Sequence, residues 1–252
     1  VFSLFISFSI LWLLFQPRFI FHYFEHNKWF SSDHSFIKSI AKNRINYWIA
    51  IASGCGLFTE LMIIRLHSSY FQLFAYFKNI SLLSCFLGLG IGYALSQKRK
   101  LLTPLVIPCL TIQILLLYIL RFSSIKNYLH SPITEQLTLG IHKIGQLDHV
   151  LIVYGFILVI FIFNMLCFIP IGHITSCIMS YQKNLIAYSW NLIGSILGIL
   201  LFSILSYLWS PPIVWISCSF LLLILFYYKE GSKFIISIIL FLLLIICLSI
   251  PV

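Results

Sequence analysis

Eight uninterrupted apolar segments constrain the fold of this chain more than any other feature. They cover roughly residues 1–16, 46–66, 71–96, 101–120, 150–170, 185–207, 213–228 and 234–250. Most of them approach the ~20 residues that an α-helix needs to cross the hydrocarbon core of a bilayer. In lipid every backbone amide must be hydrogen-bonded internally, and these runs are too long and unbroken for barrel strands. We therefore predict an all-α polytopic membrane helix bundle of seven or eight transmembrane helices.

The composition supports a multi-pass integral membrane protein. Hydrophobic residues make up 61% of the chain, charged residues only 9%, and the mean hydropathy is +1.03. A soluble domain is about 45–50% apolar and about a quarter charged. The formal net charge of +10 points to anionic lipid headgroups as the main partner. Nucleic acid is excluded as a partner, because the loops are too short for a folded basic surface. We expect a bacterial inner (plasma) membrane.

The basic residues predict the orientation. Eleven of them fall in the loops 17–45, 97–100, 183 and 229–233, whereas the connections on the opposite face hold only Arg121, Lys126 and Lys143. The positive-inside rule places the richer face in the cytoplasm. The chain then divides into an N-terminal apolar segment (1–16), a cytoplasmic or interfacial loop (17–45) and a helical membrane domain (46–252).

Histidine and cysteine spacing favours neither a metal nor a cofactor. His22 and His26 in the loop 17–45 are four residues apart, as two helical metal ligands would be, but no third ligand follows at a firm spacing. An interfacial segment is the simpler interpretation. The seven cysteines form no C-x-x-C pair, so we expect them to act as small packing residues.

Glu60 and Lys78 are the only acidic residue and the only lysine inside the apolar segments. If the second helix begins at Phe71, both lie about 9–10 Å from the same end of adjacent antiparallel helices, at ~1.5 Å per residue. Ionisable groups in hydrocarbon are costly unless they are paired or hydrated. We therefore predict a Glu60–Lys78 contact.

Two interpretations of this pair remain open. It is either a structural clamp between helices or part of a cavity in which Glu60 binds a cation or a proton. In the second case, Arg65 and His67 would lie near the mouth. Other polar residues of the apolar segments could then line the far end of the cavity or simply hydrogen-bond between helices: Asn164, His173 and Asn191.

Glycine spacing predicts where helices approach each other closely. Gly88 and Gly92 are four residues apart, as are Gly194 and Gly198, which is typical of helix-packing faces in membranes. The glycine run GLGIG lies inside an apolar segment without a preceding strand, so a dinucleotide-binding loop is excluded. Pro170 predicts that the segment from Val150 kinks or ends there.

Several of these stretches together resemble a known family. SGCGLFTELMIIRL, FAYFKNISLLSCFLGLGIGYAL, FIPIGHITSCIM and AYSWNLIGSILGILLFSILSYLWSPPIVW are similar to the membrane domain of spermidine-synthase-like membrane proteins, in which a major-facilitator-like region precedes an aminopropyltransferase domain. The resemblance covers roughly residues 46–230. The matching positions are Glu60, Arg65, Lys78, Gly88, Gly92, Pro170, Asn191, Gly194 and Pro211, all in the membrane region.

The resemblance implies no catalytic apparatus in this chain. The family's nucleotide-binding sheet has no counterpart here, and the motifs H-E-x-x-H and G-x-S-x-G do not occur. We therefore expect no enzymatic activity. The leading hypothesis is a membrane domain that binds or passes a small cationic solute, with Glu60 as the counter-charge. The alternative is a structural membrane anchor or scaffold that positions a soluble partner domain or enzyme.

Overall fold

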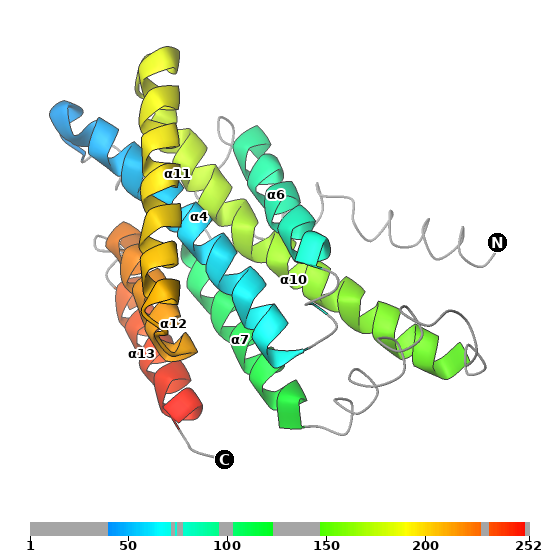
Figure 1. The fold of residues 1–252 in the computed structure, drawn as a ribbon. Helices are drawn as coiled ribbons and strands as arrows, with labels where there is room; N and C mark the ends of the chain where they lie inside the picture. Colours follow the sequence, from blue (N-terminus) through cyan, green and yellow to red (C-terminus); the bar gives the residue numbers. More distant parts are fainter. Residues whose placement is uncertain are drawn as a thin grey trace.

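The protein's computed structural model describes residues 40–71, 74, 78–95, 103–122, 147–227 and 232–249, which form seven α-helices and no strand. The helices are α4 (Ile45–Tyr70), α6 (Lys78–Leu95), α7 (Val106–Phe122), α10 (Leu147–Met179), α11 (Asn184–Tyr207), α12 (Pro212–Ile224) and α13 (Ser232–Ser249) (Figure 1). Short 3-10 turns precede α4 and α7 and follow α12. The predicted all-α class is confirmed.

Helix length separates these elements into two kinds. Three helical segments of the described chain are long and apolar enough to cross a membrane, namely Lys42–Tyr70, Tyr154–Met179 and Asn184–Tyr207. The other four helices are apolar but shorter. The predicted number of seven or eight spanning helices is thus larger than the number that length and hydropathy support. The segment 1–16 and nearly all of the loop 17–45 lie outside the described residues.

Of the two predicted effects of Pro170, a kink or an end of the helix, the end is wrong. α10 runs through Pro170 and continues for nine residues to Met179. The following turns are buried and tightly packed, because Gly172 lies against the backbone of Leu89 in α6. Packing of this kind holds the helix together where the proline removes one backbone hydrogen bond.

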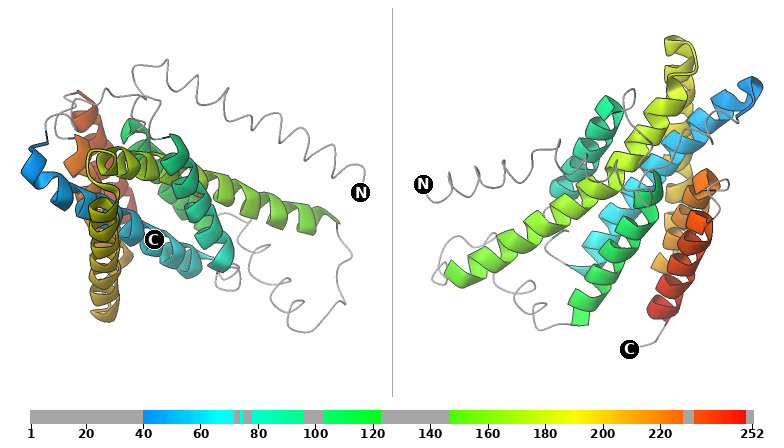
Figure 2. Two further views of the ribbon diagram at one scale, coloured as in Figure 1. Left: turned by 90° about the horizontal axis from the view of Figure 1, so that it is seen from above. Right: turned by 180° about the vertical axis from the view of Figure 1, so that it is seen from behind.

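Successive helices alternate in direction. α4, α7, α11 and α13 run one way, and α6, α10 and α12 run the other way (Figures 1 and 2). The start of α4, with Lys42 and Arg44, therefore shares one end of the bundle with Lys183 before α11. α6 ends and α13 begins at this same end. This arrangement agrees with the predicted gathering of the basic connections on one face.

A first close helix contact joins α4 and α11, which run parallel. A Cβ atom added at Gly54 would lie 2.7 Å from the carbonyl oxygen of Gly194, and one at Gly198 would collide with the carbonyl oxygen of Gly54. The same register continues in two edge-to-face ring pairs, Tyr47–Trp190 at 5.5 Å and Phe58–Phe202 at 5.6 Å. We call this contact the α4–α11 seam. Gly194 and Gly198 form the helix-packing face expected from their spacing.

A second close contact joins α6 and α10, which also run parallel. A Cβ atom at Gly88 would lie 2.8 Å from Cβ of Phe168, and one at Gly92 would lie 2.7 Å from the backbone nitrogen of His173. Gly172 on α10 meets the backbone of Leu89 from the other side. We call this contact the α6–α10 seam. In both seams the absence of side chains lets two helix backbones touch.

The two seams relate the halves of the chain to each other. In sequence order, α4, α6 and α7 form one three-helix unit, and α10, α11 and α12 form a second unit of opposite orientation (Figure 1). Each seam joins the first helix of one unit to the second helix of the other. The third helix of each unit also packs antiparallel against the first helix of the other unit. α12 contacts α4 through Ser219 and Thr59, and α7 contacts α10 through Gln113 and Asn164. This is the pattern of an inverted repeat.

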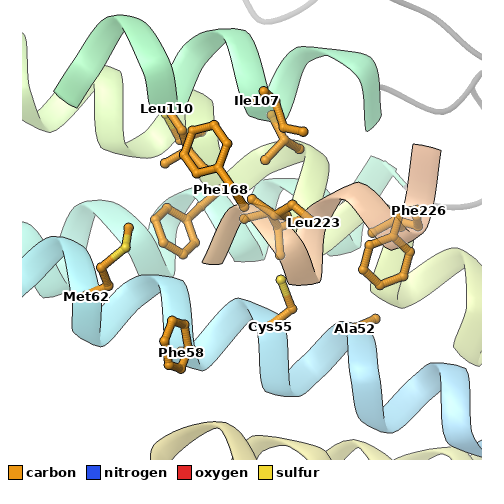
Figure 3. Close-up of a cluster of buried hydrophobic side chains, with 14 of the residues drawn as sticks. Ala52, Cys55, Phe58, Met62, Ile107, Leu110, Phe168, Leu223 and Phe226 are labelled. Atoms are coloured by element: carbon orange, nitrogen blue, oxygen red, sulfur yellow. The ribbon is translucent and has the colours of Figure 1, made fainter. Parts of the chain in front are cut away.

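The seams divide the bundle into two packed groups, and each group contains helices from both units. The first group contains α4, α11 and α12, and the second contains α6, α7 and α10. Apolar side chains from α4, α7, α10 and α12 fill the space between them (Figure 3). They include Cys55 and Met62 from α4 and Leu110 and Phe168 from the second group. α13 packs at the edge, where Phe241 stacks on Phe220 at 5.2 Å.

Large apolar side chains cover the outer surface of several helices. On α11 they include Leu185, Leu192, Leu197, Leu200 and Ile204, all exposed. The turn that follows α11 presents Trp209, which is 93% exposed and adopts a positive φ of 52°. An exposed tryptophan at the end of a long apolar helix is typical of the membrane–water interface.

Candidate functional site

A chain of polar side chains crosses the buried interior where α4, α6, α7 and α10 meet. His67 of α4 lies at its centre and is fully buried. Its Nδ1 lies 2.9 Å from Oγ of Ser81 on α6, and its Nε2 lies 3.3 Å from Nε2 of Gln113 on α7. Asn164 of α10 completes the chain by contacts with Gln113 and Ser84. We call this set the His67 network.

The hydrogen bonds of Gln113 determine which atoms donate within the network. Its amide nitrogen is a donor only, and it donates to Oδ1 of Asn164 and to Nε2 of His67. Its amide oxygen accepts from the thiol of Cys167 at 3.2 Å. Nε2 of His67 is therefore an acceptor, so the ring is neutral and donates from Nδ1 to Ser81.

Asn164 connects the network to α6 by a second hydrogen bond. Its Nδ2 donates to Oγ of Ser84 at 3.0 Å, and that hydroxyl donates to the carbonyl oxygen of Ser81 at 2.7 Å. Each amide and ring nitrogen of the network thus has a partner of the right polarity. A satisfied polar network of this kind stabilises one particular arrangement of the helices around it.

Glu60 differs from the network because its carboxyl group is buried without a partner. The residue is 2% exposed, and among the described residues neither carboxyl oxygen has a hydrogen-bond partner. It lies seven residues before His67, hence two turns along the same face of α4, about 10 Å away. A carboxylate in such a place is very costly without a counter-ion or a proton.

The register of α6 moves Lys78 away from the position predicted for it. α6 begins at Lys78, and Ser81 is level with His67 through their hydrogen bond. Lys78 therefore starts one turn beyond His67, while Glu60 lies two turns on the other side, a separation of about 15 Å along the helices. The depth estimate was wrong because it assumed that Phe71 begins the second helix level with the end of α4, whereas the hydrogen bond between Ser81 and His67 fixes a different register. The side chain of Lys78 lies outside what the structure describes, so the Glu60–Lys78 contact itself stays a prediction.

Arg65 lies on the outside of α4 and not beside Glu60. Its side chain is exposed, and its guanidinium carbon lies 5.5 Å from the ring centre of Trp215 on α12. The indole nitrogen of Trp215 donates to Oγ of Ser210 at 2.6 Å. This cation–π contact ties α4 to the turn before α12.

The polar residues predicted for the far end of a cavity separate into different places. Asn164 belongs to the His67 network. His173 is buried nine residues farther along α10, at the α6–α10 seam. Asn191 of α11 accepts a hydrogen bond from the hydroxyl of Tyr93 at 3.4 Å. The structure therefore brings His67 and Asn164 together and leaves His173 and Asn191 elsewhere.

The sequence interpretation missed Ser81, Ser84, Gln113 and Cys167. Gln113 carried a usable signal, because it is a bulky amide inside the apolar run LTIQILLLY. An amide within hydrocarbon needs a partner on another helix. The serines carried no such signal, since a serine can bond to the carbonyl of its own helix, as Ser53 does to Ile49.

Comparisons with known proteins add no relative: no protein-family model, curated protein or solved structure matches this chain. The resemblance to spermidine-synthase-like membrane domains therefore stays a prediction. Within the described part of the chain, no group of three histidine, cysteine, aspartate or glutamate residues is arranged to hold a metal ion.

Proposed function

We propose that this chain is a multi-pass membrane protein in which all seven described helices cross the bilayer. The alternation of helix directions and the basic character of one end support this proposal. α6, with 18 residues, is about 27 Å long at ~1.5 Å per residue, close to the ~30 Å hydrocarbon core. The exposed apolar side chains of α11 would then face lipid. The basic end would face the cytoplasm, where anionic headgroups attract it.

The function that the geometry supports best is the binding and passage of a small cation at Glu60. The observation that carries this proposal is the buried carboxyl group without a partner, two turns from a network in which every amide and ring nitrogen is satisfied. Ionisable residues inside membrane helices commonly mark ion or proton pathways. Glu60 is also the only acidic residue within the apolar segments.

The inverted arrangement of the two units gives the passage a physical basis. Glu60 and His67 belong to the group of α4, α11 and α12, whereas Ser81, Gln113 and Asn164 belong to the other group. Sites for small solutes in inverted-repeat transporters lie at such interfaces near the middle of the bilayer. A tilt of one group against the other would open this interface from alternate sides.

A structural role is the second candidate, and the His67 network itself favours it. Because its hydrogen bonds close within the protein, the network could serve only to fix helix register. In that case the chain would be a scaffold for a soluble partner, and Glu60 would have no ligand to exchange.

Cation passage is tested with the protein reconstituted in liposomes that carry an inside-negative potential. We expect the wild-type protein to admit protons, Na⁺ or methylammonium at least tenfold faster than empty liposomes, and we expect Glu60→Gln to remove this excess. Each probe is measured separately with a dye or a radiolabel. Glu135→Gln, a matched change in the stretch 121–149, should leave the rate unaltered. Wild-type rates equal to those of empty liposomes for all three probes would support the scaffold instead.

A further inference from the structure

We propose that the cation held by Glu60 is a proton, so that its side chain is a neutral carboxylic acid in the closed bundle. This inference rests on the proposed function and names the ligand of the same site. Three classes of cation could neutralise the carboxyl group: a metal ion, an organic ammonium ion and a proton. The surroundings of Glu60 distinguish them.

A hard metal ion needs more oxygen ligands than the site offers. Ca²⁺ takes six to eight oxygen ligands and Mg²⁺ six, mostly from carboxylates, carbonyls and water. The nearest hydroxyl along α4, that of Thr59, is already engaged with Oγ of Ser219 at 2.8 Å. In the described part of the bundle, neither oxygen of Glu60 has a hydrogen-bond partner. Within the described residues no group of three histidine, cysteine, aspartate or glutamate side chains could hold a metal ion, so Glu60 lacks the further carboxylate ligands that such an ion favours.

An organic ammonium ion meets the same difficulty. Its three N–H groups all require acceptors. The carboxyl oxygens could satisfy them only in part, and the amide oxygens of Gln113 and Asn164 are already occupied within the His67 network. Burial to 2% exposure also closes the side chain to a molecule of that size.

A proton needs neither space nor further ligands. It converts a carboxylate into a neutral acid, whose transfer into an apolar surrounding costs far less. Open to one side, the carboxylate takes up H⁺ from water; the bundle then closes over the neutral acid, and opening to the other side releases H⁺ and leaves a hydrated carboxylate. The carboxyl group thus carries one proton per cycle, and no other group has to be oxidised or reduced.

The ionisable groups around Glu60 do not supply a competing charge. The buried thiols of Cys55 on α4, Cys85 on α6 and Cys167 on α10 can be neutral or anionic, so they supply no cation. The ring of His67 is neutral by its hydrogen bonds, and Arg65 points outward over Trp215. The helix register places the start of Lys78 about 15 Å away along the helices. A proton is therefore the counter-charge that this arrangement accommodates.

The protonation of Glu60 is tested by infrared difference spectroscopy of the full-length protein in lipid. We expect the carbonyl stretch of a carboxylic acid near neutral pH, a shift of that band in protein labelled with ¹³C-glutamate, and its loss in Glu60→Gln. Glu60→Asp keeps the test valid if Glu60→Gln does not fold, because its acid band should persist but no longer shift with the glutamate label. Glu135→Gln is the matched control and should retain the band. Addition of Na⁺ or methylammonium should leave the spectrum unchanged.

Each other outcome overturns a different statement. A carboxylate signal that shifts when Na⁺ or methylammonium is added would refute the proton and retain cation binding. A carboxylate signal that responds to no cation would refute both the proton and the proposed function. An acid band that is absent in the wild type and emerges only in Lys78→Met would establish the Glu60–Lys78 ion pair in place of the proton.

Discussion

Replacement of Gly92 by alanine is expected to destabilise the protein by about 3 kcal/mol, whereas Gly90→Ala should leave it as stable or make it slightly more stable. The two glycines lie on the same helix, two residues apart. At Gly92 a new Cβ atom would collide with the carbonyl oxygen of Ile169 and lie 2.7 Å from the backbone nitrogen of His173. Backbone atoms cannot rotate away, so α6 and α10 would have to separate. Overpacking of a buried contact costs about 1–3 kcal/mol and sometimes more.

Gly90 is the matched control because nothing lies within 4 Å of the Cβ atom that alanine would add. There the change only lowers the conformational freedom of the unfolded chain, and in helices this favours alanine by up to about 1 kcal/mol. Unfolding in mixed micelles, followed by circular dichroism against the mole fraction of denaturing detergent, measures both variants. Equal stabilities of Gly90→Ala and Gly92→Ala would contradict the α6–α10 seam.

Replacement of Gln113 by leucine is expected to cost about 3 kcal/mol of stability. The change removes the partner of His67, Asn164 and Cys167 at once, and it leaves Nε2 of His67 and Oδ1 of Asn164 buried without a donor. A buried polar group that loses its partner costs about 1–3 kcal/mol. Three such losses would cost about 3–9 kcal/mol in total. Single hydrogen bonds between membrane helices contribute less, about 0.6 kcal/mol on average, so we expect a value at the lower end of that range.

A double-mutant cycle separates the network from simple loss of volume. Gln113→Leu combined with Asn164→Leu should cost at least 1 kcal/mol less than the sum of the single changes, because the double variant no longer leaves the two amides facing apolar groups. The same unfolding measurement applies. Gln182→Leu is the control: that amide donates to Asn46 at 2.7 Å near the bundle surface, where water can replace the partner. Strict additivity in the cycle would show that the two amides do not act together.

The positions of the helices could be predicted from the sequence because lipid leaves the backbone few alternatives. Every predicted apolar segment from residue 46 onward coincides with a described helix, with ends shifted by up to nine residues. The glycine spacings likewise indicated the faces on which Gly92 and Gly198 touch other helices. Spacing alone, however, does not state which helix is the partner. The α4–α11 and α6–α10 pairings required the three-dimensional structure.

The candidate site was less predictable, because it depends on register and rotation. The hydrogen bond between Ser81 and His67 fixes a register of α6 in which Lys78 starts about three turns from the level of Glu60. The sequence also identified Glu60, His67 and Asn164 as polar residues of interest without showing that Gln113 joins two of them. Contacts among four helices depend on the rotation of each helix about its own axis. When a helix is apolar on nearly all sides, its sequence does not show which side faces the interior.

The exchange of helices between the two units has a consequence for how the protein is made. α4 and α6 are synthesised and inserted before α10 and α11 exist, yet each finds its closest neighbour only in the later half. In the proposed membrane setting, the glycine faces of these early helices would contact lipid or an insertion chaperone until α10 and α11 are inserted. The two seams form only after α10 and α11 have been synthesised. If translation stopped after α7, the helices α4, α6 and α7 would lack the partner helices of both seams.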